Sequence, residues 1–422
     1  MSQTVQKSQS WKRWLTLAVL CMGAGMIYSI PYIQYTYYAP LQSALHATNQ
    51  QVGNLLSTYG IIAMIAYFPG GWLADRFSAK KLLAFSFIAT GLTGFYFATF
   101  PSYNVVMALF VIWGITTILT FWAALIKAVR MLGESSEQGR LYGLLEGGRG
   151  AITTVVGFLT LAIFTQLGSS ALGFRGVIIT YAAFLTLAGI LTIFVFDEKK
   201  VDEKTGVTLI DILKVIKMPK VWLIALIIFC AYTITATSSY LVPYLSDVFK
   251  ISVGLATALA IVRTNVMQLV GGPTFGFAAD KMKSRPRLII IGFVLMAVCL
   301  GLFILLPGNI SLVGVAVTIM IVLAFIGFGM RGIYYSIIDD AKVPLAVTGA
   351  AAGLAAFIGY IPDTFVYNLI GGWLDKYKGQ LGYQYMFTYM FVIALIGIII
   401  SAVFYVVIKN SNKKAELDKK KS

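Results

Sequence analysis

The chain has little charge for its length. Only 12% of its 422 residues are Asp, Glu, Lys or Arg, whereas soluble globular proteins have about a quarter. Its three cysteines, Cys21, Cys230 and Cys299, all lie inside apolar runs and are odd in number, so they imply no disulfide framework. The composition therefore excludes an ordinary soluble domain and a disulfide-stapled secreted one.

The sequence also lacks the motifs of enzymes and of nucleotide-driven proteins. It has no metal-ligand spacing, no phosphate-binding glycine loop and no nucleophile elbow. The one histidine, His46, falls in a loop between apolar runs. We therefore expect neither an enzyme nor a resident cofactor or metal, and no hydrolysis of nucleotides.

Apolar residues, in contrast, make up 59% of the chain. They form runs of about 20 residues, long enough to cross a bilayer as helices, and they lack the period-2 alternation of barrel strands. The sequence predicts an all-α membrane protein with twelve transmembrane helices in two six-helix bundles. In chain order, the predicted spans are 14–39, 52–73, 81–100, 103–127, 141–166, 174–196, 221–245, 253–278, 287–306, 311–336, 346–371 and 383–408.

Basic residues account for the net charge of +16, and they lie mostly in alternate loops. The loops on the side away from the N-terminus contain only Arg175, Lys250, Lys376 and Lys378. This asymmetry follows the positive-inside rule, so we expect both termini on the cytoplasmic side of the membrane. Topology then explains the charge, and no nucleic acid partner is implied.

A charged segment of mixed sign divides the chain. We expect it to include a short amphipathic helix at 209–217 on the membrane surface, and the basic tail to meet anionic lipid. The predicted parts are an N-terminal bundle at 1–196, a cytoplasmic linker at 197–220, a C-terminal bundle at 221–410 and a basic cytoplasmic tail at 411–422.

One motif occurs twice. The sequence Gly-Trp-Leu-Ala-Asp-Arg at 71–76 corresponds to Gly-Phe-Ala-Ala-Asp-Lys at 276–281, and each copy follows an apolar run and precedes a short basic loop. Equivalent placement in two six-helix halves indicates an internal duplication. Transporters use such parallel repeats to alternate between outward and inward states.

The stretch 71–83 resembles the signature between the second and third helices of the major facilitator superfamily, from which it departs at Ser78 and Ala79. The stretch 121–150 is similar to bacterial permeases related to anion:cation symporters. The resemblance implies a secondary active transporter that works by alternating access. It also implies a gating role for the motif residues Asp75, Arg76 and Asp280.

Five ionisable residues fall inside predicted spans, where each costs at least about 2.5–3.5 kcal/mol. They are Glu146, Arg149, Arg263, Arg331 and Asp363. Glu146 and Arg149 are three apart on one helix and can form an ion pair. That pair either pins its helix among its neighbours or takes part in proton coupling.

Arg263 falls near the middle of the eighth span. Its guanidinium fork suits a carboxylate, sulfonate or phosphate, and the alternative is an ion pair with Asp363. Asp363 follows Pro362, which predicts a kink, and is a candidate for proton coupling or for a permanently ionised partner of Arg263. Arg331, close in sequence to two aspartates at 339 and 340, is a candidate for a cytoplasmic gate.

Polar and aromatic side chains in the first, fourth and seventh spans could contact a solute; packing or a place in an aromatic belt is the alternative. These candidates are Tyr32, Gln34, Tyr35, Trp122 and Tyr240.

The sequence thus favours a proton-coupled secondary transporter of a small anionic or polar organic solute. Arg263 would bind the anion, and Asp363 or the Glu146–Arg149 pair would exchange the proton. Two alternatives stay open: a proton-driven exporter of lipophilic compounds and a membrane receptor that transports nothing. The expected partners are the solute, protons or another coupling ion, and the lipid bilayer, with the chain as a monomer.

Overall fold

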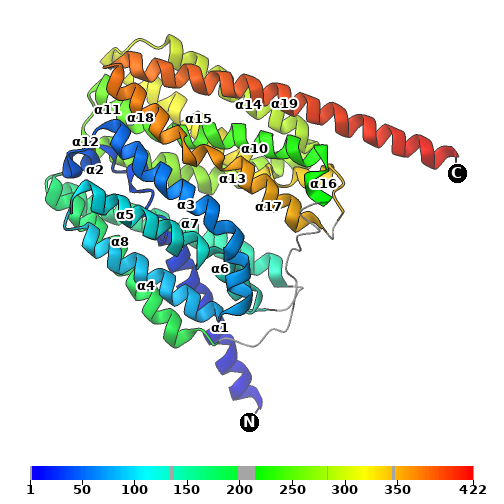
Figure 1. Cartoon of the computed structure of the whole chain (residues 1–422), viewed down its shortest axis with the longest axis horizontal. Helices are drawn as coiled ribbons and strands as arrows, with labels where there is room; N and C mark the ends of the chain where they lie inside the picture. The colour runs from blue at the N-terminus through cyan, green and yellow to red at the C-terminus, as the bar shows by residue number, and fades with distance from the viewer. Residues whose placement is uncertain (1, 134–136, 198–213, 283, 345–346, 422) are drawn as a thin grey trace. The chain divides into compact units, whose positions relative to one another are not determined.

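The computed structural model describes residues 2–133, 137–197, 214–282, 284–344 and 347–421. All regular secondary structure in these residues is helical (Figure 1), which confirms the prediction of an all-α protein. By their contacts, the residues divide into two compact units.

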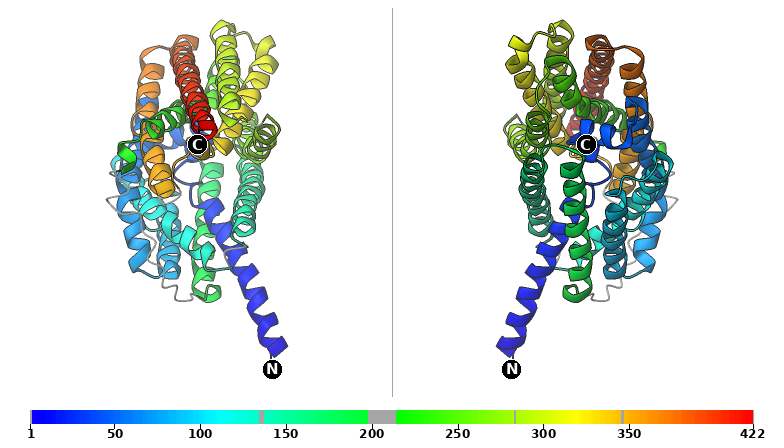
Figure 2. Two further views of the ribbon diagram at one scale, coloured as in Figure 1. Left: turned by 90° about the vertical axis from the view of Figure 1, so that its right-hand side faces the viewer. Right: turned by 90° about the vertical axis from the view of Figure 1, so that its left-hand side faces the viewer.

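The first unit runs from the N-terminus through α8 and also takes in residues 252–261. Its helices pack mainly as the pairs α4 with α8, α1 with α7 and α3 with α5. The N-terminal end of α1 projects beyond the other helices of this unit (Figure 2). The elements are α1 (Ser2–Met26), η1 (Ile33–Tyr35), α2 (Tyr38–Leu45), α3 (Asn49–Arg76), α4 (Ala79–Phe97), α5 (Tyr103–Gly114), η2 (Ile115–Leu119), α6 (Trp122–Arg130), α7 (Gln138–Gln166), α8 (Ala171–Val195) and α12 (Val253–Ile261).

The second unit contains the remaining helices. Its main pairs are α14 with α19, α13 with α15, and α10 with both α17 and α19. The elements are α10 (Pro219–Thr237), η4 (Ser238–Tyr240), α11 (Leu241–Phe249), η5 (Val262–Val266), α13 (Met267–Met282), α14 (Arg285–Leu305), η6 (Ile310–Leu312), α15 (Val313–Ile333), α16 (Ile337–Asp340), α17 (Thr348–Gly359), η8 (Ile361–Thr364), α18 (Val366–Lys376) and α19 (Gln380–Lys421).

Each of the twelve predicted spans coincides with helix. Nine helical stretches of the described residues are long and apolar enough to cross a membrane. The other three predicted spans, 14–39, 52–73 and 81–100, correspond to α1 with η1, α3 and α4. The two lysines at the start of α4 lower the mean hydropathy of that helix.

Within the described residues, five of the spans are interrupted in their interior by a 3-10 or π-helical segment. The first unwinds after α1 into the short 3-10 turn η1, and the fourth contains the π-helical segment η2. The seventh, eighth and eleventh spans contain η4, η5 and η8. The eleventh span is interrupted between α17 and α18 by η8, which contains Pro362. The kink predicted there is therefore confirmed.

The predicted linker lies mostly outside the described residues. Within it, residues 214–216 are helical, and most of the amphipathic helix predicted at 209–217 falls outside what the structure describes. The backbone of the predicted tail continues α19 as helix to Lys421.

Glycines let α4 and α8 approach closely. A Cβ atom on Gly91 of α4 would lie 2.9 Å from the carbonyl oxygen of Ala182 and 3.0 Å from the amide nitrogen of Thr186, both in α8. A Cβ on Gly189 of α8 would lie 3.1 Å from the carbonyl oxygen of Ala84 in α4. Small residues at such crossings allow backbone contact between membrane helices.

This contact predicts an asymmetric response to added methyl groups. Gly91→Ala should destabilise the protein by about 1–3 kcal/mol because backbone atoms must move apart. Gly143→Ala on α7, where nothing lies within 4 Å of the new Cβ, should be neutral or stabilising by up to about 1 kcal/mol. Thermal unfolding of the purified protein in detergent measures both, and equal midpoints would contradict the close crossing.

Candidate functional site

Polar interior side chains gather where the helices are broken. Gln34 lies in η1, Thr117 in η2, Ser238 in η4, Arg263 in η5 and Asp363 in η8, and all five are buried. Irregular backbone at membrane depth is tolerated only where it is buried in protein or lines a water-filled cavity. The helix breaks therefore indicate where the functional site of each unit lies.

Arg263 is almost completely buried, with 2% of its surface exposed. It lies in the π-helical segment η5, and such segments often occur at functional sites. Its Nη1 donates a hydrogen bond of 3.0 Å to the hydroxyl of Ser238 in η4. Two helix breaks from different spans of the second unit thus meet at one guanidinium group.

Asp363 is held by tyrosines. The hydroxyl of Tyr232 on α10 donates to its Oδ2 at 2.8 Å, and the hydroxyl of Tyr367 on α18 donates to its Oδ1 at 2.9 Å. Tyr240, a candidate solute contact, is fully buried. Its hydroxyl donates to the carbonyl oxygen of Tyr367 at 2.8 Å.

A cluster of tyrosines connects this carboxylate with Arg331. The rings of Tyr232 and Tyr360 are 4.5 Å apart, and the hydroxyl of Tyr360 lies 3.1 Å from that of Tyr334. Tyr334, Tyr360 and Tyr232 all lie close to the Arg331 guanidinium. Polar groups therefore extend from Asp363 through rings and hydroxyls to a cation at the end of α15.

The aspartates near Arg331 in sequence have a different partner. Nη1 of Arg285, at the start of α14, lies 3.5 Å from Asp339 and 3.9 Å from Asp340. Burial raises the pKa of Asp340 above its usual value, although Arg285 opposes this shift and Asp339 adds to it. Among the described residues, Arg331 forms no ion pair with Asp339 or Asp340, although it is close to them in sequence. A gating role for Arg331 stays a prediction.

In the first unit, aromatic side chains surround the η1 break. The ring of Tyr32 lies 5.1 Å from that of Tyr35 and 5.2 Å from that of Tyr59 on α3. The hydroxyl of Tyr59 lies 2.8 Å from that of Thr117 in the η2 break. Tyr28 donates to the Thr117 carbonyl at 3.3 Å, so the breaks of the first and fourth spans are also joined.

Gln34 lies in the same break with 1% of its surface exposed. Neither its amide nitrogen nor its amide oxygen has a hydrogen-bond partner among the described residues. Burying an unsatisfied amide costs about 1–3 kcal/mol. A group retained at this cost is a candidate for binding a polar ligand.

The predicted pair of Glu146 and Arg149 is confirmed as an ion pair, with Arg149 Nη1 2.6 Å from Glu146 Oε1. Arg149 also donates from Nε to the carbonyl oxygen of Ala24 on α1 at 3.2 Å, and its guanidinium lies 5.9 Å from the ring centroid of Trp122. The arginine thus connects three helices of the first unit, while the glutamate is exposed.

The two copies of the repeated motif lie at the C-terminal ends of α3 and α13. Arg76 stacks over Trp72 at 4.3 Å, and Lys127 donates to the carbonyl oxygen of Ala74 at 2.7 Å, near the C-terminal end of α3. Asp280 in the second copy is exposed. The side chain of Asp75 lies outside what the structure describes.

Sequence reasoning missed the partners of the charged groups. Ser238, Tyr232 and Tyr367 were not among the candidates, yet they contact Arg263 and Asp363. Tyr367 lies four residues after Asp363, so i,i+4 spacing could have indicated it. Nothing in the sequence signals the contact between Tyr232 and Asp363, which are 131 positions apart.

Two bundles of broken membrane helices with buried polar groups define the class of polytopic membrane transporters. A family model described as Major Facilitator Superfamily matches residues 14–365. The chain belongs to this superfamily, so it is a secondary transporter rather than an enzyme, with the twelve-helix fold predicted from the sequence.

Relatives and solved structures agree with this family. The inner membrane protein YihN of Escherichia coli K12 is 32% identical over 96% of this chain and 98% of that protein. The inner membrane protein YqcE of the same organism is 33% identical over 93% and 94%. The solved nucleoside transporter NupG superposes with a TM-score of 0.74 at 14% identity, over 93% of this chain and 99% of that one.

A bacterial homologue of the human lysosomal transporter Spinster, solved in an inward-facing form, superposes with a TM-score of 0.69 at 14% identity. The alignment covers 96% of this chain and 98% of that one. At this identity the two solved structures show the fold alone.

The contacts of the Glu146–Arg149 pair predict unequal effects of removing its members. Arg149→Ala should destabilise the protein by about 1.5–3 kcal/mol, because it removes charged hydrogen bonds to two helices. Glu146→Ala should cost less than about 1 kcal/mol, as for other exposed ion pairs. Thermal unfolding in detergent at low and high salt measures both, and a larger effect of Glu146→Ala would contradict the bridging role of Arg149.

Proposed function

We propose that this transporter moves a small organic anion across the bacterial inner membrane by alternating access, coupled to protons. The single observation that carries the proposal is the buried guanidinium of Arg263 at the meeting of two helix breaks. Both relatives are inner membrane proteins by name, and the basic loops favour cytoplasmic termini.

The geometry at Arg263 supports an anionic solute. A buried guanidinium has five donors in a rigid fork, and the hydrogen bond to Ser238 at 3.0 Å fixes one edge of it. Bidentate recognition of a carboxylate, sulfonate or phosphate uses this kind of fork. The desolvation cost of keeping an arginine at this depth is offset when an anion binds there.

The surroundings of Asp363 support its role as the proton-coupling group. Tyrosine hydroxyls donate to an ionised carboxylate, and they can rotate to accept from the protonated acid. Tyr232 and Tyr367 therefore satisfy both protonation states. Glu146, the other candidate, is exposed and is paired at 2.6 Å with Arg149.

Within the first unit, the candidate solute contacts lie together at the η1 break. Gln34 offers a buried amide, and Tyr32 and Tyr35 offer hydroxyls and ring faces at the same break. We assign these three residues to the organic part of the solute, because amides and tyrosines bind polar organic groups without a net charge.

The role of Arg263 predicts a loss of affinity for anions. The purified protein should be stabilised against heat by some carboxylates, sulfonates or phosphate esters and not by their neutral amide or alcohol analogues. For the stabilising anion, Arg263→Ala should weaken binding at least about thirtyfold, and Arg263→Lys should recover part of the loss. Uptake into proteoliposomes should fall in parallel.

Arg175→Ala is the matched control, since Arg175 donates to a backbone carbonyl in the first unit and should leave anion affinity unchanged. Normal affinity and uptake in Arg263→Ala would refute the assignment. Binding without any flux in the wild-type protein would instead support a receptor, and stabilisation by lipophilic compounds alone would support an exporter.

The role of Asp363 predicts a separation of exchange from accumulation. Asp363→Asn should lose accumulation driven by a pH gradient, because the amide cannot exchange a proton, and should keep counterflow of labelled solute across proteoliposomes with equal pH inside and out. Glu146→Gln should keep both activities. If Glu146→Gln abolishes accumulation while Asp363→Asn keeps it, the proton is exchanged at the glutamate instead.

A further inference from the structure

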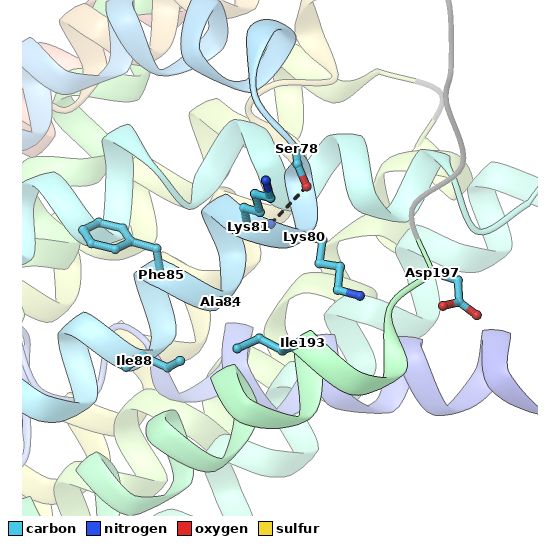
Figure 3. Close-up of a pocket in the computed structure, with 8 residues that line it drawn as sticks. All are labelled: Ser78, Lys80, Lys81, Ala84, Phe85, Ile88, Ile193 and Asp197. Carbon is cyan, nitrogen blue, oxygen red and sulfur yellow. Dashed lines mark hydrogen bonds between the residues drawn. The ribbon is translucent and has the colours of Figure 1, made fainter.

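A cavity of about 730 Å³ lies where α4 and α8 meet at the basic end of the first unit (Figure 3). Its volume is within the range of about 300–1,000 Å³ for small-molecule sites, and it is too large for a single inorganic ion. Its rim is polar and its wall is apolar. The lining residues are Ser78, Lys80, Lys81, Ala84, Phe85, Ile88, Ile193 and Asp197.

The rim contains two cations. The ammonium groups of Lys80 and Lys81 make no hydrogen bond or ion pair with the residues that the structure describes. The hydroxyl of Ser78 accepts from the amide nitrogen of Lys81 at 3.2 Å and caps α4. Both lysines lie in the first turn of α4, where the helix dipole is positive and also favours an anion.

In the second unit, the corresponding cation has a side-chain partner. α14 packs on α19 as α4 packs on α8, and Arg287, like Lys81, is the third residue of its helix. Arg287 donates to the hydroxyl of Tyr405 on α19 from Nε at 2.9 Å and from Nη2 at 2.6 Å. The cation therefore has a hydroxyl partner in the second unit, whereas in the first unit it lies on the rim of a cavity.

The apolar wall continues from the rim along the membrane-spanning part of the two helices. Phe85 and Ile88 extend it along α4, and Ile193 faces them from α8 (Figure 3). The side chains of Phe85 and Ile193 are 54% and 43% exposed. A ligand that matches both regions has an anionic head followed by an apolar chain.

We propose that this cavity binds one anionic phospholipid of the bilayer leaflet on the side of the basic loops. Its phosphate lies between Lys80 and Lys81, and its acyl chain lies along Phe85, Ile88 and Ile193. Basic pockets between membrane helices at the ends of spans suit such head groups. None of its lining residues is assigned to the proposed transport pathway.

One acidic group is part of the same rim. The carboxylate of Asp197 lies 3.1 Å from Nζ of Lys12 on α1, so that lysine neutralises it. The positive charges of Lys12, Lys80 and Lys81 together outnumber the negative charge of Asp197, so the rim keeps a net positive charge. Removing the aspartate should release Lys12 and tighten lipid binding.

Native mass spectrometry of the full-length protein in detergent tests the proposal, with dioleoyl phosphatidylglycerol and dioleoyl phosphatidylcholine as probes. The wild-type protein should bind phosphatidylglycerol preferentially. Lys80→Gln/Lys81→Gln should weaken phosphatidylglycerol binding about 25-fold, at about fivefold for each lysine, and leave phosphatidylcholine unchanged. Asp197→Asn should strengthen phosphatidylglycerol binding.

The control Lys281→Gln/Lys409→Gln removes the same charge from exposed positions of the second unit and should change binding by less than about twofold. Lys80→Arg/Lys81→Arg keeps the charge and should retain binding, which distinguishes lost recognition from lost folding. Glycerol 1-phosphate tests for a site that takes a free anion, and it should not displace the lipid.

Three results would overturn the proposal: equal binding of both lipids by the wild-type protein, retained phosphatidylglycerol affinity in Lys80→Gln/Lys81→Gln, or displacement of the lipid by glycerol 1-phosphate at the concentration at which phosphatidylglycerol binds.

Discussion

The need to satisfy every polar group away from water constrains the rest of this structure. In hydrocarbon, a continuous α-helix satisfies its own backbone, and a broken one does not. Here the breaks η4, η5 and η8 coincide with Ser238, Arg263 and Asp363. Backbone irregularity and buried charge therefore occur together, and each is stable because protein rather than lipid surrounds it.

The two units use this constraint differently. In the first, the breaks join through tyrosine rings and the hydroxyl of Thr117, and the buried amide of Gln34 is neutral. In the second, the breaks contain an arginine and a carboxylate, each with a hydroxyl partner. The helix breaks of this duplicated scaffold thus contain neutral polar and aromatic side chains in the first unit and charged side chains in the second.

The apolar runs predicted all twelve spans, because hydropathy over about 20 residues is a local property. The breaks were harder to predict. Only η8 had a signal, from Pro362, since π-helical and 3-10 segments such as η2 and η4 have no residue that enforces them. Packing of the neighbouring helices selects these conformations, and a single sequence does not reveal it.

The helices, the duplication and the Glu146–Arg149 ion pair could all be predicted from the sequence. The ion pair was predictable because i,i+3 spacing on a helix brings two side chains together wherever the helix lies. In contrast, only the packing of the helices shows that Asp363 contacts Tyr232 and that Arg285, not Arg331, pairs with Asp339. These contacts join different helices, and which side chains meet there depends on how the helices rotate and pack, a property that no local spacing in the chain determines.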